Sequence, residues 1–150
     1  MEIINLKKNQ KTNYIEMVAK LEKELWNDNS TLQNYKTSIK LGLKRGNYNI
    51  FLALENDIPL GYVETDIFYS WDETYSSLPI LQICGLYVSP IMRKQGVATS
   101  LIKECENYAR DFGCKQIASN YYSFNTISAN LHQKLGFKET SRIVNVIKDL

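Results

Sequence analysis

The chain has few of the residues that build metal centres and disulfide frameworks. Its 150 residues include one histidine, His132, and three cysteines, Cys84, Cys105 and Cys114, with no C-x-x-C pair. His132 is close in sequence to no cysteine or carboxylate pair with ligand spacing, so we expect no metal site. An odd number of cysteines without a secretory leader is typical of a reduced, cytoplasmic protein.

Long apolar runs and a strong net charge are also missing. No apolar run approaches the ~20 residues that a membrane helix needs, so we expect no membrane association. The net charge is +2, which is too close to neutral to indicate a nucleic-acid partner. The length, with 44% hydrophobic and 23% charged residues, predicts a single domain spanning residues 1–150 with a core of its own.

Basic residues are absent from one long window. Between Asn47 and Met92 there is no lysine or arginine, whereas the same window holds six acidic residues: Glu55, Asp57, Glu64, Asp66, Asp72 and Glu73. This asymmetry favours a face that attracts cations. A chance run of solvated acids on strands and turns would give the same composition.

Hydrophobic periodicity predicts an α/β (α+β) chain. Helices are expected over residues 11–26, from Ser30 or Thr31 to about residue 46, over 97–112, and over 125–135. Strands are expected over residues 2–6, 48–54, 60–68, 80–88 and 116–119, with one or two more within 137–147. Residues 55–57 read as a hairpin-type turn. The order indicates one mostly antiparallel sheet with helices against it.

The stretch after the strand at 80–88 has the pattern of a phosphate site. Arg93-Lys94-Gln95-Gly96-Val97-Ala98 fits [Q/R]-x-x-G-x-[G/A] where a helix begins. The first N–H groups of a helix have no partner within the helix, and with the helix dipole they attract anions. Gly96 lets a ligand approach the backbone closely because it has no Cβ. An ordinary strand–turn–helix connection has the same pattern, so the motif alone does not decide.

A second motif makes the reading specific. Residues 125–137, NTISANLHQKLGF, resemble the signature N-x-x-[AS]-x-x-L-Y-x-x-x-G-F of the GCN5-related N-acetyltransferases (GNAT). Leu86-Tyr87-Val88 followed by residues 93–98 resembles the acetyl-CoA pyrophosphate motif of the same family. The resemblance implies the GNAT fold, a mixed, mostly antiparallel sheet with a splay between its two central strands and four flanking helices. It also implies acetyl-CoA as the cofactor.

Scattered stretches resemble one subgroup, the small dimeric bacterial aminoglycoside 6′-N-acetyltransferases. Among them are Glu24-Leu25-Trp26, Gln95-Gly96-Val97-Ala98-Thr99 and Leu135-Gly136-Phe137-Lys138-Glu139-Thr140. This resemblance implies a homodimer, in which the alternating residues 142–147 would pair across the interface.

Carried over residue by residue, the resemblance assigns the cofactor site. Backbone groups of Leu86 and Val88 would bind the pantetheine arm like an added strand, and the N–H groups of residues 94–99 would hold the pyrophosphate. Asn125 would bind the arm, cap the last helix, or do both. The implied cofactor-binding residues are Leu86, Tyr87, Val88, Arg93, Lys94, Gln95, Gly96, Val97, Ala98, Thr99 and Asn125.

Acetyl transfer to an amine requires a base, a polarised carbonyl and an acid for the leaving thiolate. The resemblance places the backbone N–H of Leu86 at the carbonyl. Glu64 is the best candidate base, the alternative being an outward-facing strand acid. His132 occupies the position where the family often has a tyrosine acid, but it is more simply a packed histidine; Tyr121 and Tyr122 are the other candidate acids.

The acceptor site is expected to be aromatic and acidic. Such a site suits a polycationic amino sugar, although either tryptophan could instead lie in the core. Two positions depart from the resistance enzymes, which have an acid where Cys84 precedes Gly85 and an aspartate where Asn120 follows Ser119. The candidate substrate-binding residues are Trp26, Asp66, Trp71, Asp72, Glu73, Cys84 and Asn120.

Three functions remain open at this point. The first is acetyl-CoA-dependent transfer to the 6′-amine of an aminoglycoside by direct transfer in a ternary complex. The second is the same chemistry on a polyamine, another small amine or a protein amino group. The third is a non-catalytic acyl-CoA-binding module.

Overall fold

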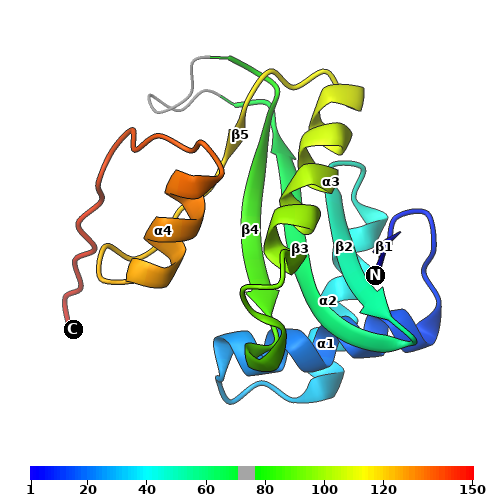
Figure 1. The fold of residues 1–150 in the computed structure, drawn as a ribbon. Coiled ribbons are helices and arrows are strands. Elements are labelled where there is room, and N and C mark those ends of the chain that lie inside the picture. Colours follow the sequence, from blue (N-terminus) through cyan, green and yellow to red (C-terminus); the bar gives the residue numbers. More distant parts are fainter. Residues whose placement is uncertain (71–76) are drawn as a thin grey trace.

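The computed structural model describes residues 1–70 and 77–150, which form one sheet with helices on both of its faces (Figure 1). The strands are β1 (Glu2–Asn5), β2 (Tyr48–Glu55), β3 (Ile58–Phe68), β4 (Ile80–Val88) and β5 (Ile117–Ala118). They follow one another across the sheet in sequence order. Neighbours are antiparallel from β1 to β4, and β5 pairs with β4 in parallel. This is the mixed, mostly antiparallel sheet that was predicted.

Each described helix begins and ends within two residues of its predicted position. They are α1 (Thr12–Trp26), α2 (Leu32–Lys44), α3 (Val97–Asp111) and α4 (Thr126–Lys134), with a 3-10 turn η1 (Pro90–Met92) between β4 and α3. Thr31 caps α2, accepting a hydrogen bond from the backbone N–H of Asn34. None of the helices in the described part of the chain is long and apolar enough to cross a lipid bilayer.

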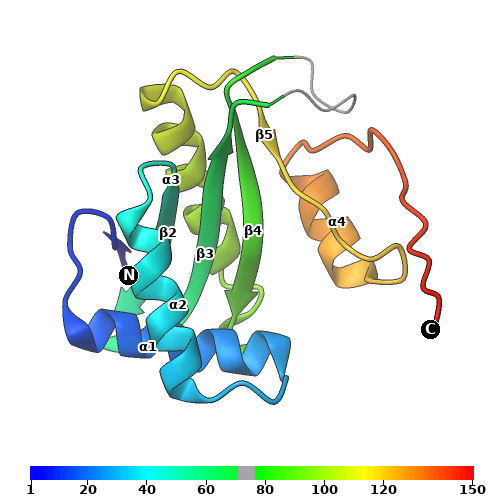
Figure 2. The same cartoon turned by 180° about the vertical axis from the view of Figure 1, so that it is seen from behind.

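The core lies on both faces of the sheet. Ile50, Leu52 and Leu54 of β2 pack with α1 and α2 on one face, and Phe51 and Ala53 pack with α3 on the other. Figure 2 shows α1 and α2 together on the face opposite α3. Because β2 is covered on both sides, its sequence is a continuous apolar run instead of an alternating one.

The β2–β3 hairpin confirms the turn predicted at residues 55–57. Asn56 and Asp57 both have positive φ, 51° and 62°. Two consecutive left-handed residues form the type I′ turn whose twist matches that of paired strands, and asparagine and aspartate tolerate this conformation best after glycine.

The prediction of one or two strands within residues 137–147 is wrong for a single copy of the chain. Residues 137–150 adopt no helix or strand, and the side chains of Ile143 and Ile147 are 80% and 95% exposed. The alternating pattern is present, but a strand requires a neighbouring strand edge to satisfy its backbone. In both views α4 and this tail stand away from the rest of the molecule, beyond β5 (Figures 1 and 2).

Candidate active site

β4 and β5 pair over a short stretch only and then diverge. β5 pairs only with Leu81 and Gln82 of β4, whereas β4 continues along β3 as far as Val88. In the described part of the chain, no strand pairs with residues 83–88 on the edge that faces β5. This confirms the predicted splay. Unpaired backbone groups on a strand edge can bind an extended ligand as a further strand.

The loop beyond β4 ends in a set of backbone donors. Gly96, the N-cap of α3, has φ 82°, and Lys94 also has a positive φ of 63°. The first hydrogen bond of this helix runs from the N–H of Ser100 to the carbonyl of Gly96, at 3.0 Å. The N–H groups of residues 97–99 therefore have no carbonyl one turn earlier to bind. A Cβ on Gly96 would meet nothing within 4 Å, so the approach to these donors is open.

Arg93 and Gln95 hold this loop in place. The Arg93 side chain donates to the Val88 carbonyl (3.1 Å), and its guanidinium lies 5.9 Å from the centre of the Tyr87 ring. Gln95 donates to the Ile91 carbonyl at 3.0 Å. These bonds tie the donors at the start of α3 to the end of β4. The arrangement fits a diphosphate followed by an extended arm along β4.

Glu64 of β3 lies beside the part of β4 whose outer edge is unpaired. It lies opposite Gly85 in the β3–β4 register, and its Oε2 atom is 3.4 Å from the position that a Cβ on Gly85 would occupy. Burial raises the pKa of Glu64 above its ordinary value, although the nearby hydroxyl of Tyr48 favours the carboxylate and opposes the shift. A carboxylate with a raised pKa holds a proton more readily, as a general base near neutral pH must.

A pocket of about 320 Å³ adjoins Glu64. It lies between α2 and the β2–β3 strands, so an acceptor bound there would have the carboxylate at its edge. The lining residues are Ser38, Leu41, Gly42, Arg45, Tyr48 and Glu64.

Sequence analysis missed two buried residues next to this place, Tyr62 and Glu22. The Tyr62 ring is fully buried, and its hydroxyl lies 3.6 Å from the Cβ position of Gly85. Glu22 of α1 is 5% exposed, and burial, followed by the nearby Glu64, raises its pKa to about 8. One signal was available, because Glu22 lies four residues after Val18 and so falls on the apolar stripe of its helix.

Trp26 lies over the surroundings of Gly85. It ends α1, and its Cζ2 atom lies 3.7 Å from the same Cβ position on Gly85. Half of its surface, 52%, is exposed. A core position for Trp26 is therefore wrong, and the side chain is placed to contact a ligand beside Gly85.

His132 is packed. Its Nδ1 donates to the Ser128 carbonyl at 2.8 Å, since a carbonyl only accepts, and its Nε2 shares a hydrogen bond with the Ser119 hydroxyl at 2.7 Å. The ring lies 4.9 Å from the Tyr121 ring and 5.0 Å from the Phe137 ring. Both ring nitrogens are thus engaged: the Nδ1 bond lies within α4, and the Nε2 bond joins α4 to the chain that follows β5.

Asn125 caps α4. Its Oδ1 accepts from the backbone N–H of Ser128 at 3.0 Å. The capping role proposed for this residue from the sequence is therefore present.

The remaining predicted acceptor residues are dispersed. Asp66 is buried and pairs with Arg45 at 2.9 Å, so its charge is neutralised within the protein. Asn120 lies exposed beyond β5. Trp71, Asp72 and Glu73 lie outside the described residues.

Cys84 is the extra residue of a bulge in β4, because Ile83 pairs with Thr65 and Gly85 with Glu64. Cys84 is exposed, yet desolvation by the surrounding protein and then the adjacent Glu64 raise the pKa of its thiol to about 12. Cys84 is therefore protonated at neutral pH and unsuited to nucleophilic attack.

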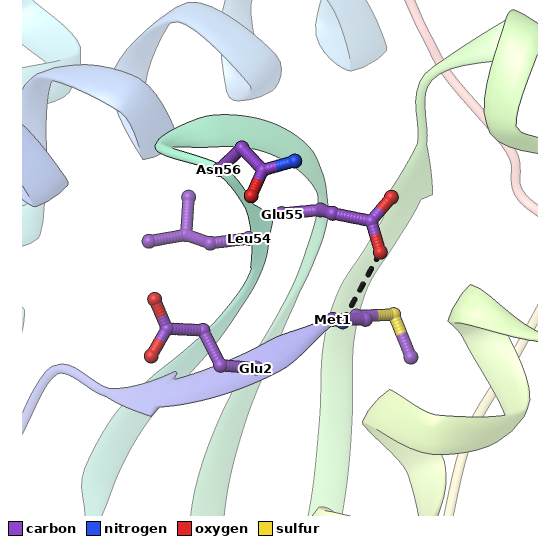
Figure 3. A pocket seen from close by; sticks show the side chains of 5 residues that line it. All are labelled: Met1, Glu2, Leu54, Glu55 and Asn56. Carbon is purple, nitrogen blue, oxygen red and sulfur yellow. Dashed lines mark hydrogen bonds and ion pairs between the residues drawn. The ribbon is translucent and has the colours of Figure 1, made fainter.

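A second pocket, of about 390 Å³, lies at the opposite edge of the sheet (Figure 3). It is lined by Met1, Glu2, Leu54, Glu55 and Asn56. The terminal ammonium of Met1 pairs with Glu55 at 3.1 Å. Because β1 and β2 are far from the β4–β5 splay in the strand order, this pocket is separate from the site around Gly85.

Relatives of known structure share this architecture. The chain superposes on AAC(6')-Iy, solved in complex with the bisubstrate analog CoA-S-monomethyl-acetylneamine, with a TM-score of 0.88 and 26% identity, covering 99% of this chain and 98% of that one.

Relatives in sequence carry a related name. The aminoglycoside N(6')-acetyltransferase type 1 of Klebsiella aerogenes is 32% identical over 124 residues, 80% of each protein. The enzyme of the same name from Salmonella typhimurium is 33% identical over 94 residues, so the match spans 63% of this chain and 65% of the relative. The sequence pattern described as "Acetyltransferase (GNAT) family" matches residues 11–137. With the splayed strands and the donors at the start of α3, this shows that the chain belongs to the acetyltransferase (GNAT) family.

Proposed function

We propose that the protein is an acetyl-CoA-dependent N-acetyltransferase that acts on a primary amine of a cationic substrate, namely the 6′-amine of an aminoglycoside. The observation that carries the proposal is the placement of Glu64 beside Gly85, on the part of β4 whose outer edge is unpaired. A base on β3, the open edge of β4 for the thioester arm and an anion site at the start of α3 for its phosphates thus follow one another beside β4. The likeness to a structure that holds a CoA–neamine analog supports the substrate class.

The cofactor-binding residues proposed from the sequence fit coenzyme A. The N–H groups of residues 94–99 would hold the pyrophosphate, while Leu86 and Val88 would bind the arm through their backbone. Arg93 and Tyr87 support the loop, as their mutual contact indicates. When bound, acetyl-CoA supplies an acetyl group activated as a thioester. Asn125 lies at the start of α4, where its side-chain oxygen Oδ1 already caps the helix.

The chemistry follows from the placement of the side chains. Glu64 accepts the proton of the ammonium, through a water, and the freed nitrogen forms a bond to the acetyl carbon as the carbon–sulfur bond breaks. The N–H of Leu86 stabilises the charge that develops on the acetyl oxygen. The attacking nitrogen passes its second proton to water as the amide forms, and the sulfur, which leaves with the electron pair of the broken bond, receives a proton. Tyr121 is favoured over His132 as the donor of that proton, because both nitrogens of His132 are engaged.

Direct transfer in a ternary complex is favoured over an acylated enzyme. Cys84 and Cys105 both have pKa values raised mainly by burial, that of Cys84 to about 12. The pKa of Cys114 is raised by burial as well. With all three held as thiols, the attacking amine itself is the nucleophile that the site can supply.

An acceptor panel tests the proposal. Purified protein with acetyl-CoA should release free thiol with kanamycin faster than with spermidine or with a lysine-containing peptide, and the product should carry the acetyl group on the 6′-amine. Release with spermidine but none above background with kanamycin would contradict the aminoglycoside proposal. Coenzyme A binding without thiol release for any amine would indicate the non-catalytic module instead.

We also propose that the protein works in the cytoplasm as a homodimer that pairs through its C-terminal tail, residues 137–150. The three cysteines are free, which supports a reducing compartment. The tail exposes Ile143, Val144, Val146 and Ile147 almost completely. Contiguous apolar side chains of this kind are normally covered, and a second copy can offer a strand edge to the tail.

Charge in the tail should therefore abolish the dimer. The double variant Val144→Asp/Val146→Asp is expected to sediment as a monomer, because two carboxylates would have to be buried in an apolar contact. Asn145→Asp, an exposed polar position between them, should leave the dimer intact. Analytical ultracentrifugation measures both. A wild-type protein that sediments as a monomer at micromolar concentration would contradict the dimer.

A further inference from the structure

We propose that Glu22, with the hydroxyl of Tyr62 and the carboxylate of Glu64, forms a subsite that selects polycationic acceptors, which makes Glu22 a specificity-determining residue. The inference rests on the proposed N-acetyltransferase function and adds a residue on α1 to the acceptor site. It explains how this chain provides acidic recognition although Cys84 and Asn120 are not acids.

The placement of Glu22 is unusual for a glutamate. It lies on the buried face of α1 with Ile15, Val18 and Leu21, and 5% of its surface is exposed. In the described part of the chain, no side chain donates a hydrogen bond to its carboxyl group and no cation contributes to its electrostatic surroundings. A carboxyl group without a partner in an apolar layer costs stability, and such groups concentrate at binding sites.

A second, independent feature points to a ligand at the same place. The hydroxyl of Tyr62 is completely buried and has no hydrogen-bond partner in the described part of the chain. Trp26 lies close enough to act on it but does not complete a bond with hydrogen-bond geometry. The hydroxyl lies beside Gly85, as does the Glu64 carboxylate. A donor brought by a ligand would satisfy the hydroxyl where the acceptor amine must sit.

The described groups around Glu22 provide little positive charge. The groups that act electrostatically on or with Glu22 are Tyr35 of α2, Tyr48 of β2, and Tyr62 and Glu64 of β3. All of these are neutral or acidic. Arg45 acts on Glu64 but pairs directly with Asp66. Two ammonium groups of one acceptor can therefore neutralise Glu22 and Glu64 together, which a monoamine cannot do.

The protonation of Glu22 gives the subsite a pH signature. Its pKa is raised from 4.5 to about 8 by burial first and Glu64 second, so the free protein holds it neutral at pH 7. An incoming cation favours the ionised form, and binding should therefore release a proton. As pH rises through about 8 the carboxylate forms beforehand, so binding of the polycation should tighten.

The test compares Glu22→Gln with Glu16→Gln, a partly exposed glutamate on the same helix paired with lysines. Glu22→Gln should raise the KM for kanamycin at least tenfold, with kcat and the KM for acetyl-CoA changed less than threefold. The KM for 6-amino-6-deoxyglucose, a monoamine, should change less than threefold. Glu16→Gln should match wild type throughout. An unchanged kanamycin KM in Glu22→Gln would overturn the proposal.

Calorimetry gives a readout that does not depend on turnover. Kanamycin titrated into wild-type protein at pH 7, in buffers of different ionisation enthalpy, should show release of up to one proton, and Glu22→Gln should show none. Equal proton release in both proteins would overturn the subsite even if acetylation is observed. If no amine is acetylated but this difference is found, the subsite stands and the proposed reaction fails.

Thermal unfolding shows whether the variant is folded and whether Glu22 is buried as described. Because the folded-state pKa is raised, Glu22 favours the folded protein below about pH 4.5, and this contribution is lost as pH rises through about 8. Glu22→Gln should therefore gain stability relative to wild type between pH 5 and pH 9. A difference in Tm that does not change with pH would contradict the burial on which the subsite depends.

Discussion

Replacing Glu64 with glutamine is expected to lower kcat/KM for an aminoglycoside by about 10³-fold, within the range typical of a lost general base. Glutamine keeps the shape of the side chain but cannot accept the proton of the attacking ammonium. Steady-state thiol release measures the effect. Coenzyme A affinity should be unchanged, because Glu64 is on β3 whereas the proposed cofactor contacts are on β4 and α3.

Tyr48→Phe serves as the companion variant. The Tyr48 hydroxyl acts on Glu64 and lowers its pKa, in opposition to burial. Removing the hydroxyl should raise the pKa of Glu64 further, so the acidic limb of the rate profile should move to higher pH while the maximal rate is largely kept. A Glu64→Gln variant with near-wild-type activity would mean that a water chain or another group removes the proton.

Replacing Gly96 with valine is expected to weaken coenzyme A binding by about 100-fold. At φ 82° a residue with a Cβ is strained by roughly 1–2 kcal/mol, more when β-branched. The loop should relax away from this conformation, which would turn the N–H groups of residues 97–99 away from a common anion. The branched side chain would also occupy the open space beside them. Isothermal titration with coenzyme A measures the affinity.

Gly113→Val is the matched control. Gly113 follows the other end of the same helix with φ 91°, and a Cβ there would likewise meet nothing within 4 Å. Both variants should lose a similar amount of unfolding free energy in chemical denaturation, but only Gly96→Val should lose coenzyme A affinity. Equal loss of affinity in both variants would show that the effect comes from instability and that the start of α3 does not bind the phosphates.

The turn and the free N–H groups at the start of α3 were predictable from the sequence because their geometry is local. The donors at the start of α3 follow from Gly96 and the residues next to it, whatever packs around them. The caps Thr31 and Asn125 bind N–H groups only three residues away. Such short-range features depend on neighbours in the chain, and a motif records them directly.

The acceptor side was predicted less well because it is assembled from distant segments. Trp26, Tyr62 and Glu64 converge on Gly85 from one helix and one strand that are far apart in the sequence. Asp66 was expected to face a substrate, but in the fold it pairs with Arg45. No local pattern states which charges will be paired, because pairing depends on which element packs opposite.

The sequence by itself determined most elements of this protein, their order, the turn with free backbone donors at the start of α3, and the family. Periodic burial and single-turn hydrogen bonds are properties of adjacent residues, so they could be read without a fold. Only the tertiary structure decided that Glu22 is buried beside Glu64, and that residues 137–147 find no strand edge to join. Desolvation and strand pairing both depend on what the rest of the chain brings to a residue, and that is settled only when the elements pack.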